Sequence, residues 1–482
     1  MILLTIARLR PLAALFLTGS LLGGLSAADQ PPRRPNILFL AIDDLRPELG
    51  FYGDSQVKSP NIDRVAAQGV LFNRAYCQVA VCGASRASLM TSILPTANRF
   101  TIARTRADED APGAATMPQM FKAAGYTTLS NGKIFHFGAD TDARSWSEPS
   151  WHPKASHATS HDPATTAQRS KDNRSRIYES PDVPDNAYGD GMVAEKTIED
   201  LRRLKADGKP FFLACGFIRP HLPFYAPKKY WDLYDRAKLT LADNRYRPEN
   251  APAGLKGSNE YKSYEPGGYV DGTDEWHRMM RHGYYASVSY ADKLVGDVLA
   301  ELDRLGLAEN TIVVIWGDHG WHLGEHDFWG KHNTLKNALR IPLIMKVPGL
   351  AAGHRTEGLV ASLDIFPTLC ALAGVATPDT IQGRSFAALL KQPEQKFRDE
   401  VYSRYGKGDA VVTENMIYTS YGADGEMLYD HRTDPNENHN LAGQSASAAT
   451  VADMRRRLAA QQLLASQAKI GPPVRAGKRI PD

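Results

Sequence analysis

The residues of this chain whose types and spacing can do chemistry include one cysteine at the start of a predicted helix. Cys82 opens the run Cys82-Gly83-Ala84-Ser85-Arg86. A thiol at a helix N-terminus meets unpaired backbone amides and the positive end of the helix dipole, which favour the thiolate. Arg86 follows one helical turn later, on the same face. On its residues alone, the run is compatible with a nucleophile or with an ordinary buried or reactive thiol.

Two pairs of residues offer metal ligands. Asp43-Asp44 follows an apolar run, and leaving both carboxylates ionised beside a buried strand end requires a cation. Taken alone, such a pair is also typical of a solvated turn or a helix cap. Asp318-His319 follows a second apolar run. Carboxylate oxygens suit Ca²⁺ or Mg²⁺, and an imidazole also admits Mn²⁺ or Zn²⁺.

The elements that must position these residues are buried strands alternating with helices. Apolar runs at 36–42, 211–217, 311–316 and 341–347 predict strands, and Leu294, Val298 and Leu302 recur at helical spacing. This alternation predicts an α/β fold with a large, mostly parallel sheet flanked by helices. Ligands bind beyond the carboxyl ends of such strands. Asp43-Asp44, His221 and Asp318-His319 all follow predicted strands, so one site can collect them.

The chain divides into four predicted segments. Residues 1–28 are predicted to be a signal peptide, residues 29–375 a catalytic domain, residues 376–467 a small α+β subdomain with a short antiparallel sheet, and residues 468–482 a loosely held tail. The polar stretch at 140–190 is predicted to be a long loop region. It either walls a pocket or forms a surface excursion.

Composition narrows the class of protein. The 482 residues are 43% hydrophobic and 23% charged with a formal net charge of +3, which is typical of a folded globular chain and gives no basic field for nucleic acid. Arg8 and Arg10 precede an apolar run that ends in Ser26-Ala27-Ala28, so we expect export to the periplasm or beyond the cell. An uncleaved anchor is the alternative there, and no later segment is predicted to span a membrane. Four cysteines form at most two disulfides.

Several motifs together resemble the type I sulfatases, over roughly residues 34–441. They are the run around Cys82 and Arg86, Asp43-Asp44 after the first strand, and the set Gly132-Lys133-Ile134-Phe135-His136, Arg219-Pro220-His221-Leu222-Pro223-Phe224, Asp318-His319-Gly320, Gly324-Glu325-His326 and Lys331. The family signature usually has Pro where this chain has Ala84. That departure bears on which maturation enzyme accepts the chain.

The resemblance implies an alkaline-phosphatase-like fold and a specific chemistry. Cys82 would be oxidised to formylglycine, whose hydrate has two hydroxyls. One attacks sulfur and the other later expels sulfate from the covalent intermediate. By resemblance, one divalent metal, expected to be Ca²⁺ with Mg²⁺ or Mn²⁺ possible, is held by Asp43, Asp44, the converted Cys82, Asp318 and His319. The implied catalytic residues are Cys82, Arg86, Lys133, His136, His221 and Lys331.

The resemblance is strongest to the iduronate-2-sulfatase-like branch, which carries His after the Asp of Asp318-His319. It implies a sulfated saccharide substrate with a 2-O-sulfated uronic acid, and formylglycine-generating machinery as a partner during maturation. Arg99, Arg104 and His152 are candidates for reading the substrate carboxylate. Two alternatives stay open: a phosphatase or phosphonate monoester hydrolase of the same superfamily, and a catalytically dead, secreted glycan-binding protein.

Overall fold

The computed structural model describes residues 34–350 and 352–474. The predicted signal peptide and residues 475–482 of the predicted tail therefore lie outside the described residues. The strands are β1 Asn36–Ile42, β2 Val70–Phe72, β3 Ala75–Tyr76, β4 Thr127–Gly132, β5 Tyr178–Glu179, β6 Phe211–Phe217, β7 Phe224–Tyr225, β8 Thr311–Gly317, β9 His322–Leu323, β10 Trp329–Gly330, β11 Leu343–Lys346, β12 His354–Thr356, β13 Val360–Ala361, β14 Glu400–Tyr405, β15 Gly408–Thr413, β16 Met416–Ser420 and β17 Glu426–Asp430. The helices are α1 Pro60–Ala67, α2 Cys82–Thr91, α3 Ala107–Asp110, α4 Met117–Ala123, α5 Asp142–Ser145, α6 Pro163–Asp172, α7 Gly189–Asp207, α8 Lys228–Trp231, α9 Asp274–Arg304, α10 Lys336–Leu339, α11 Ile365–Ala373 and α12 Ala448–Ser466.

The central sheet has seven strands in the order β12-β2-β11-β8-β1-β6-β4. β1 pairs in parallel with β6 and β8, and β4 pairs in parallel with β6. β11 runs antiparallel to both β8 and β2. The prediction of a large, mostly parallel sheet is confirmed, with one reversed strand inside it.

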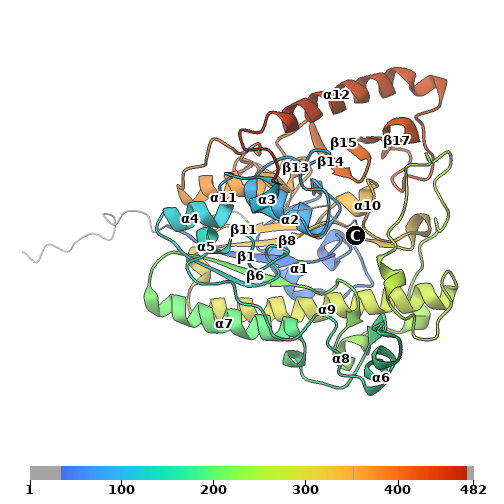
Figure 1. Ribbon diagram of the computed structural model, residues 1–482. Coiled ribbons are helices and arrows are strands. Elements are labelled where there is room, and N and C mark those ends of the chain that lie inside the picture. The colour runs from blue at the N-terminus through green and yellow to red at the C-terminus, as the bar shows by residue number, and fades with distance from the viewer. Residues whose placement is uncertain (1–33, 351, 475–482) are drawn as a thin grey trace, which may run out of the picture. The chain divides into compact units, whose positions relative to one another are not determined.

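Successive side chains of a strand point to opposite faces of the sheet, and an apolar core covers each of the two faces. In β1, Ile37, Phe39 and Ala41 belong to one apolar core, and Leu38, Leu40 and Ile42 belong to the other. Figure 1 shows α2, α3 and α4 on one side of the sheet and α7 and α9 on the other. The continuous apolar runs of the sequence follow from this double burial.

A four-stranded antiparallel sheet, β14-β15-β16-β17, forms the smaller C-terminal part together with α12. Its apolar residues join the same core as α2. The predicted short antiparallel sheet in the C-terminal part of the chain is confirmed. The described part of the predicted tail is tied to the body of the protein, because the amides of Gly471 and Val474 donate to the carbonyls of Pro112 and Glu109.

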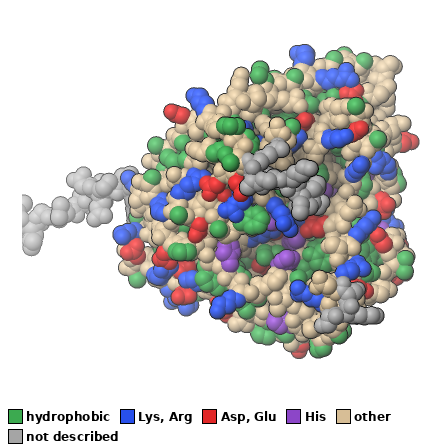
Figure 2. Space-filling view, viewed as in Figure 1, with side chains coloured by type: hydrophobic (Ala, Val, Ile, Leu, Met, Phe, Trp, Pro, Cys, Tyr) green, Lys and Arg blue, Asp and Glu red, His purple; other side chains and the backbone are tan. Residues whose placement is uncertain are grey.

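The remaining predictions about organisation have mixed outcomes. All four cysteines are buried free thiols. Among the described residues, no helix is long and apolar enough to cross a membrane. The stretch at 140–190 contains α5, α6 and β5, so it is more structured than the predicted loop. Figure 2 shows acidic and basic side chains intermingled over the face in view, consistent with the small net charge.

Candidate active site

Four neighbouring parallel strands each deliver site residues at their carboxyl ends. β8 leads to Asp318 and His319, and β1 leads to Asp43 and Asp44. β6 leads to the loop that carries His221, and β4 leads to Lys133. Carboxyl ends of adjacent parallel strands meet at one edge of a sheet, which is where α/β folds place their ligands. The expectation that one site collects residues from several strand ends is therefore met.

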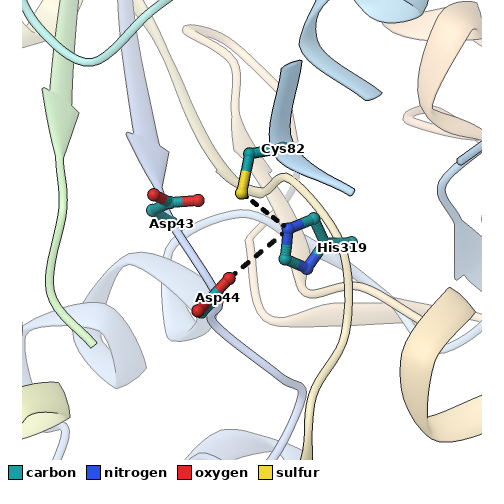
Figure 3. A group of neighbouring side chains, drawn as sticks. All are labelled: Asp43, Asp44, Cys82 and His319. Atoms are coloured by element: carbon teal, nitrogen blue, oxygen red, sulfur yellow. Dashed lines mark hydrogen bonds and ion pairs between the residues drawn. The ribbon is translucent and has the colours of Figure 1, made fainter. Parts of the chain in front are cut away.

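A metal-type cluster lies at this edge. Asp43, Asp44, Cys82 and His319 each offer one ligand atom, and these atoms lie within 4.8 Å of one another. Figure 3 shows the four side chains converging from β1, α2 and the segment after β8. The Asp318 carboxylate is adjacent, since its Oδ1 accepts from the Asp44 amide at 3.1 Å.

The chemistry of this donor set fits a hard divalent cation. Asp43, Asp44, Asp318 and His319 are fully buried. Asp43 Oδ1 accepts no hydrogen bond, although a buried carboxylate oxygen without a donor is costly. Three crowded carboxylates with such an open oxygen are the ligands that Ca²⁺ or Mg²⁺ takes.

Helix α2 positions Cys82 and Arg86 against the carboxylates. Cys82 is its first residue, and the whole helix is buried. Gly83 allows the close packing, because a Cβ there would lie 1.8 Å from the carbonyl oxygen of Ala103. Arg86 Nε donates to Asp318 Oδ2 at 2.9 Å, and Arg86 Nη2 lies 3.5 Å from Asp43 Oδ1. One arginine therefore bridges two of the carboxylates.

The contacts of His319 fix the tautomer of its neutral ring. Nδ1 lies 3.0 Å from the carbonyl oxygen of Gly320, which only accepts, so Nδ1 carries the proton. Nε2 faces Cys82 Sγ at 3.2 Å and Asp44 Oδ1 at 3.4 Å. In the neutral ring Nε2 is the lone-pair nitrogen, which is the form that binds metals.

Two lysines neutralise the aspartate pair. Lys133 forms an ion pair with Asp43, and Lys331 Nζ lies 3.0 Å from Asp44 Oδ1. Lys331 also lies over the ring of Trp321, 5.0 Å from its centroid. Burial and then Lys133 lower the pKa of His136 to about 3, so this ring is neutral at ordinary pH. Its Nδ1 is buried without a hydrogen-bond partner.

The site pushes the pKa values of its acids apart. Burial raises the pKa of Asp43, but Lys133 and Arg86 outweigh it and hold that pKa well below its usual value. Burial, with the charge of Asp43, raises the pKa of Asp318. Acids in one site whose pKa values diverge are typical of functional clusters.

The prediction that the helix N-terminus favours the thiolate of Cys82 is wrong. Burial, and then the negative charge of Asp43, raise the pKa of this thiol well above its usual value. The side chain is 2% exposed. Desolvation of the anion outweighs the helix dipole, whose effect is at most about 2 kcal/mol.

His221 and Lys331 share a partner that the sequence did not reveal. Glu260 Oε1 lies 3.1 Å from His221 Nε2, and Glu260 Oε2 lies 2.8 Å from Lys331 Nζ. Glu260 belongs to a short 3-10 helix, Glu260–Ser263, in the segment between α8 and α9. That segment has neither periodicity nor a motif, so nothing in the sequence pattern singles out this acid.

The stretch at 140–190 walls the site in part. The ring of His157 packs against His221 with centroids 5.9 Å apart, and its carbonyl accepts from Arg219 Nη2 at 2.6 Å. Arg99 lies elsewhere, donating to the carbonyls of Asp110 and Ala465. Arg104 and His152 are exposed, and no contact joins them to the cluster of Figure 3.

A cavity of about 470 Å³ lies beside the loop that carries Lys331. His332 lines it and stacks on Tyr405 of β14, with centroids 5.0 Å apart and planes 10° apart. Lys256 and Lys407 also line the cavity. The C-terminal sheet thus contributes to the surroundings of the site.

Comparison with known proteins places this geometry in a family. A family model described as sulfatase matches residues 35–375, and one described as N-sulphoglucosamine sulphohydrolase, C-terminal, matches residues 324–463. The chain is 36% identical over 405 residues to iduronate 2-sulfatase of Mus musculus, covering 75% of this chain and 73% of the relative. It is 34% identical over 451 residues to iduronate 2-sulfatase of Homo sapiens, covering 83% of this chain and 80% of the relative.

Solved structures agree on the fold. The phosphonate monoester hydrolase of Agrobacterium radiobacter superposes with a TM-score of 0.73 at 22% identity, covering 89% of this chain and 96% of that chain. BT4656 in complex with its substrate D-glucosamine-2-N,6-O-disulfate gives a TM-score of 0.72 at 21% identity, covering 92% and 100%. The resemblance predicted from the motifs is confirmed by the match over residues 35–375 and by the iduronate 2-sulfatase relatives: the chain belongs to the sulfatase family and is a sulfuric ester hydrolase.

Proposed function

We propose that this enzyme hydrolyses a sulfate ester with a formylglycine hydrate made from Cys82 beside one divalent cation, for which Ca²⁺ is our choice. One observation carries the proposal: Asp43, Asp44, Cys82 and His319 converge within 4.8 Å at the edge of the sheet. When bound, the cation supplies positive charge for the nonbridging sulfate oxygens. Asp43, Asp44, Asp318 and the Nε2 of His319 would hold it.

The basic side chains around the cluster give the site its preference for an anion. Arg86 braces Asp318 and Asp43, so the carboxylates stay together. Lys133 and Lys331 stand on opposite members of the aspartate pair, and their ammonium groups can bind sulfate oxygens. Preorganised cations in a buried site stabilise the charge that spreads over a sulfuryl group in the transition state.

The remaining assignments concern the nucleophile and the leaving group. His136 is neutral and buried, which suits a hydrogen bond to a hydroxyl of the converted Cys82. His221 and Lys331 are the proton donors available to the departing oxygen. Burial lowers the pKa of His221, but the negative charges of Asp44, Glu260 and Asp43 together outweigh it, so the net shift of the pKa is upward.

For substrate, we infer a sulfated saccharide that carries a 2-O-sulfated uronic acid. Two iduronate 2-sulfatases among the relatives support this choice. The cavity beside His332 supports it too, since its volume of about 470 Å³ falls in the range of about 300–1,000 Å³ that is usual for small-molecule sites. Lys256 along it suits an anionic sugar, whereas Lys407 is paired with Asp424.

We further infer that the chain is exported with the loss of residues 1–28, and that a formylglycine-generating enzyme accepts Ala84 in place of Pro. The first inference is supported by Arg8 and Arg10, by the apolar run that follows them, and by the small residues Ser26-Ala27-Ala28 at its end. N-terminal sequencing of the protein recovered from its host tests it. A mature chain that still begins at Met1 would contradict it.

The decisive experiment is peptide mass spectrometry across Cys82 paired with a sulfate-release assay. Conversion lowers the peptide mass by about 18 Da. We expect that mass change, together with sulfate release from 2-O-sulfated uronate disaccharides that is abolished in Cys82→Ala. An active enzyme that retains an unmodified Cys82 would refute the mechanism, and activity confined to other sulfates would refute the substrate.

A second candidate function is hydrolysis of phosphate or phosphonate monoesters. A multifunctional alkaline phosphatase superfamily protein of Trinickia caryophylli is 26% identical to this chain, covering 87% of it and 93% of the relative. Relative rates on an aryl sulfate and the matching aryl phosphate separate the two functions. We expect the sulfate to react faster.

A further inference from the structure

We propose that Glu260 is a positioning residue of this site, which keeps His221 as an imidazolium and anchors the Lys331 ammonium beside it. The proposal rests on the proposed function of His221 and Lys331 at the leaving group. It adds a residue that neither the motifs nor the comparisons point to. It also assigns a protonation state to the imidazole ring of His221.

The contacts of His221 define that state. Nδ1 lies 2.6 Å from the carbonyl oxygen of Leu222, which can only accept a hydrogen bond. Nε2 lies 3.1 Å from Glu260 Oε1, and an ionised carboxylate also only accepts. Both ring nitrogens must therefore donate, which only the doubly protonated ring can do.

The surroundings of Glu260 keep its own carboxylate ionised. Burial raises its pKa, but Lys331 and His221 outweigh that effect and hold the pKa well below its usual value. The side chain is 22% exposed, and those of His221 and Lys331 are 12% and 2% exposed. Removing one partner of such a sheltered pair leaves an uncompensated charge.

The charged groups that face His221 come from several elements. Asp43 and Asp44 follow β1, Lys331 follows β10, and Glu260 precedes α9. Burial and Lys331 lower the pKa of His221, while Asp44, Glu260 and Asp43 raise it, and the net shift is upward. The ring of His157 packs edge-on against it and is neutral at ordinary pH, because burial lowers its pKa to about 3.

This arrangement has a chemical use. One carboxylate joins both donors, so the Nε2 proton and the Lys331 ammonium lie on the same side of the site. As the nucleophile bonds to sulfur, the bond between sulfur and the ester oxygen breaks and its electron pair stays with the oxygen. That oxygen takes the Nε2 proton, which leaves its hydrogen bond to Glu260, and departs as an alcohol. The imidazolium becomes neutral imidazole and later regains a proton from water. Glu260 contacts neither reacting atom, so it acts through His221 and Lys331.

The test compares Glu260→Gln with two variants in otherwise intact, metal-loaded enzyme. Glu260→Asp keeps the negative charge. Glu265→Gln is a matched control. Glu265 lies in the same segment, its side chain is 19% exposed, and it pairs with Arg176 at 3.4 Å instead of with His221. Each variant is assayed on a saccharide sulfate, whose alkoxide needs a proton, and on an aryl sulfate, whose phenoxide needs it far less.

We expect Glu260→Gln to lower kcat/KM on the saccharide at least about tenfold, since a general acid contributes about 10²–10⁴-fold. The loss on the aryl sulfate should stay below about threefold. Removing a negative charge beside an imidazolium lowers its pKa, so the alkaline limb of the saccharide pH profile should move to lower pH. Glu260→Asp should retain most of the wild-type profile, and Glu265→Gln all of it.

A second measurement stands apart from activity. Histidine-selective NMR follows the titration of His221, assigned by the signal that disappears in His221→Gln, and we expect its pKa to fall in Glu260→Gln. Equal losses on both substrates with an unchanged titration would overturn the proposal. If the wild-type enzyme released no sulfate from any substrate, the proposed function would fail, while this titration would still decide whether Glu260 sets the state of His221.

Discussion

Two largely buried ionic clusters lie close together in the chain and differ in kind. The first is the metal-type cluster of Figure 3 with its lysines. The second, which we call the arginine–glutamate quartet, comprises Arg46, Glu48, Arg281 and Glu325. In the quartet, Arg46 lies 2.8 Å from Glu48 and 3.0 Å from Glu325, and Arg281 lies 3.2 Å from Glu48.

The quartet is a charge-balanced network of two arginines and two glutamates. Each glutamate faces two guanidinium groups, and burial of Glu325 is outweighed by Arg46 and Arg281, which hold its pKa far below the usual value. Arg46 also donates to the carbonyl of Trp321 at 3.0 Å. The metal-type cluster instead crowds three carboxylates together, and burial with the charge of Asp43 raises the pKa of Asp318. Burial of charge alone therefore does not mark a functional site. Crowding of like charges without enough counter-charge does.

The largest effect is expected on activity, for a substitution in the metal-type cluster that leaves stability unchanged. Asp318→Asn should lower sulfate release by at least about 10⁴-fold, or about 5.5 kcal/mol at 1.36 kcal/mol per tenfold. Because the pKa of Asp318 is raised, a neutral amide should leave the metal-free protein as stable as wild type, or more so. Urea unfolding with a chelator present checks this, with exposed Asp303→Asn as control. A loss of about 3 kcal/mol in stability would make Asp318 a structural residue instead.

The quartet should respond in the opposite way. Glu325→Gln leaves two buried arginines short of a counter-charge, which we expect to lower the free energy of unfolding by about 3–5 kcal/mol. The exposed Glu275→Gln on α9 should stay within about 0.5 kcal/mol. The measurement is urea unfolding of both variants. A loss below about 1 kcal/mol for Glu325→Gln would erase the contrast between the two clusters.

Cation binding should stabilise only through the metal-type cluster. At a free Ca²⁺ concentration of 100 times its Kd, linkage adds about 2.7 kcal/mol to the stability of the folded protein. We expect that gain in wild type and in Glu275→Gln, and its loss in Asp43→Asn. Thermal unfolding with and without Ca²⁺, Mg²⁺ or Mn²⁺ measures it. A gain that persists in Asp43→Asn would place the cation elsewhere.

The smallest effect is expected for an exposed pair. Lys407 Nζ lies 2.8 Å from Asp424, with side chains 78% and 42% exposed. Solvent screening leaves such pairs with little net stabilisation, so Asp424→Ala should barely change stability. Thermal unfolding of this variant provides the baseline for both buried clusters. A loss of stability as large as that expected for Glu325→Gln would show that burial does not determine the size of these effects.

The sequence predicted most of the sheet and the residues at its edge, because strands buried on both faces read as unbroken apolar runs. β1 and β6 have the predicted bounds, and β8 is one residue longer. An apolar run does not encode strand direction, so the reversal of β11 was not predictable. The division of the chain at residue 375 stays a prediction.

The candidate site was predictable where a residue follows a strand or lies in a motif, and not elsewhere. Asp43, His221 and Asp318 follow strands that the structure places side by side. Glu260 lies in a segment without pattern, and only the fold brings it to Lys331. The thiol of Cys82 shows the limit of a local argument: the helix N-terminus was visible in the sequence, but the burial that outweighs it was not.

The burial of Cys82 also sets an order of events in the life of the chain. In the folded protein α2 is enclosed, and the sulfur lies against His319 behind the aspartates. A modifying enzyme must bind several residues around its target. In the folded protein every residue of α2 is buried, so none is accessible to another protein. The oxidation of Cys82 that we propose would therefore have to precede folding, so the two processes would compete in time. Any change that speeds folding of this region should leave a larger fraction of the molecules permanently unconverted.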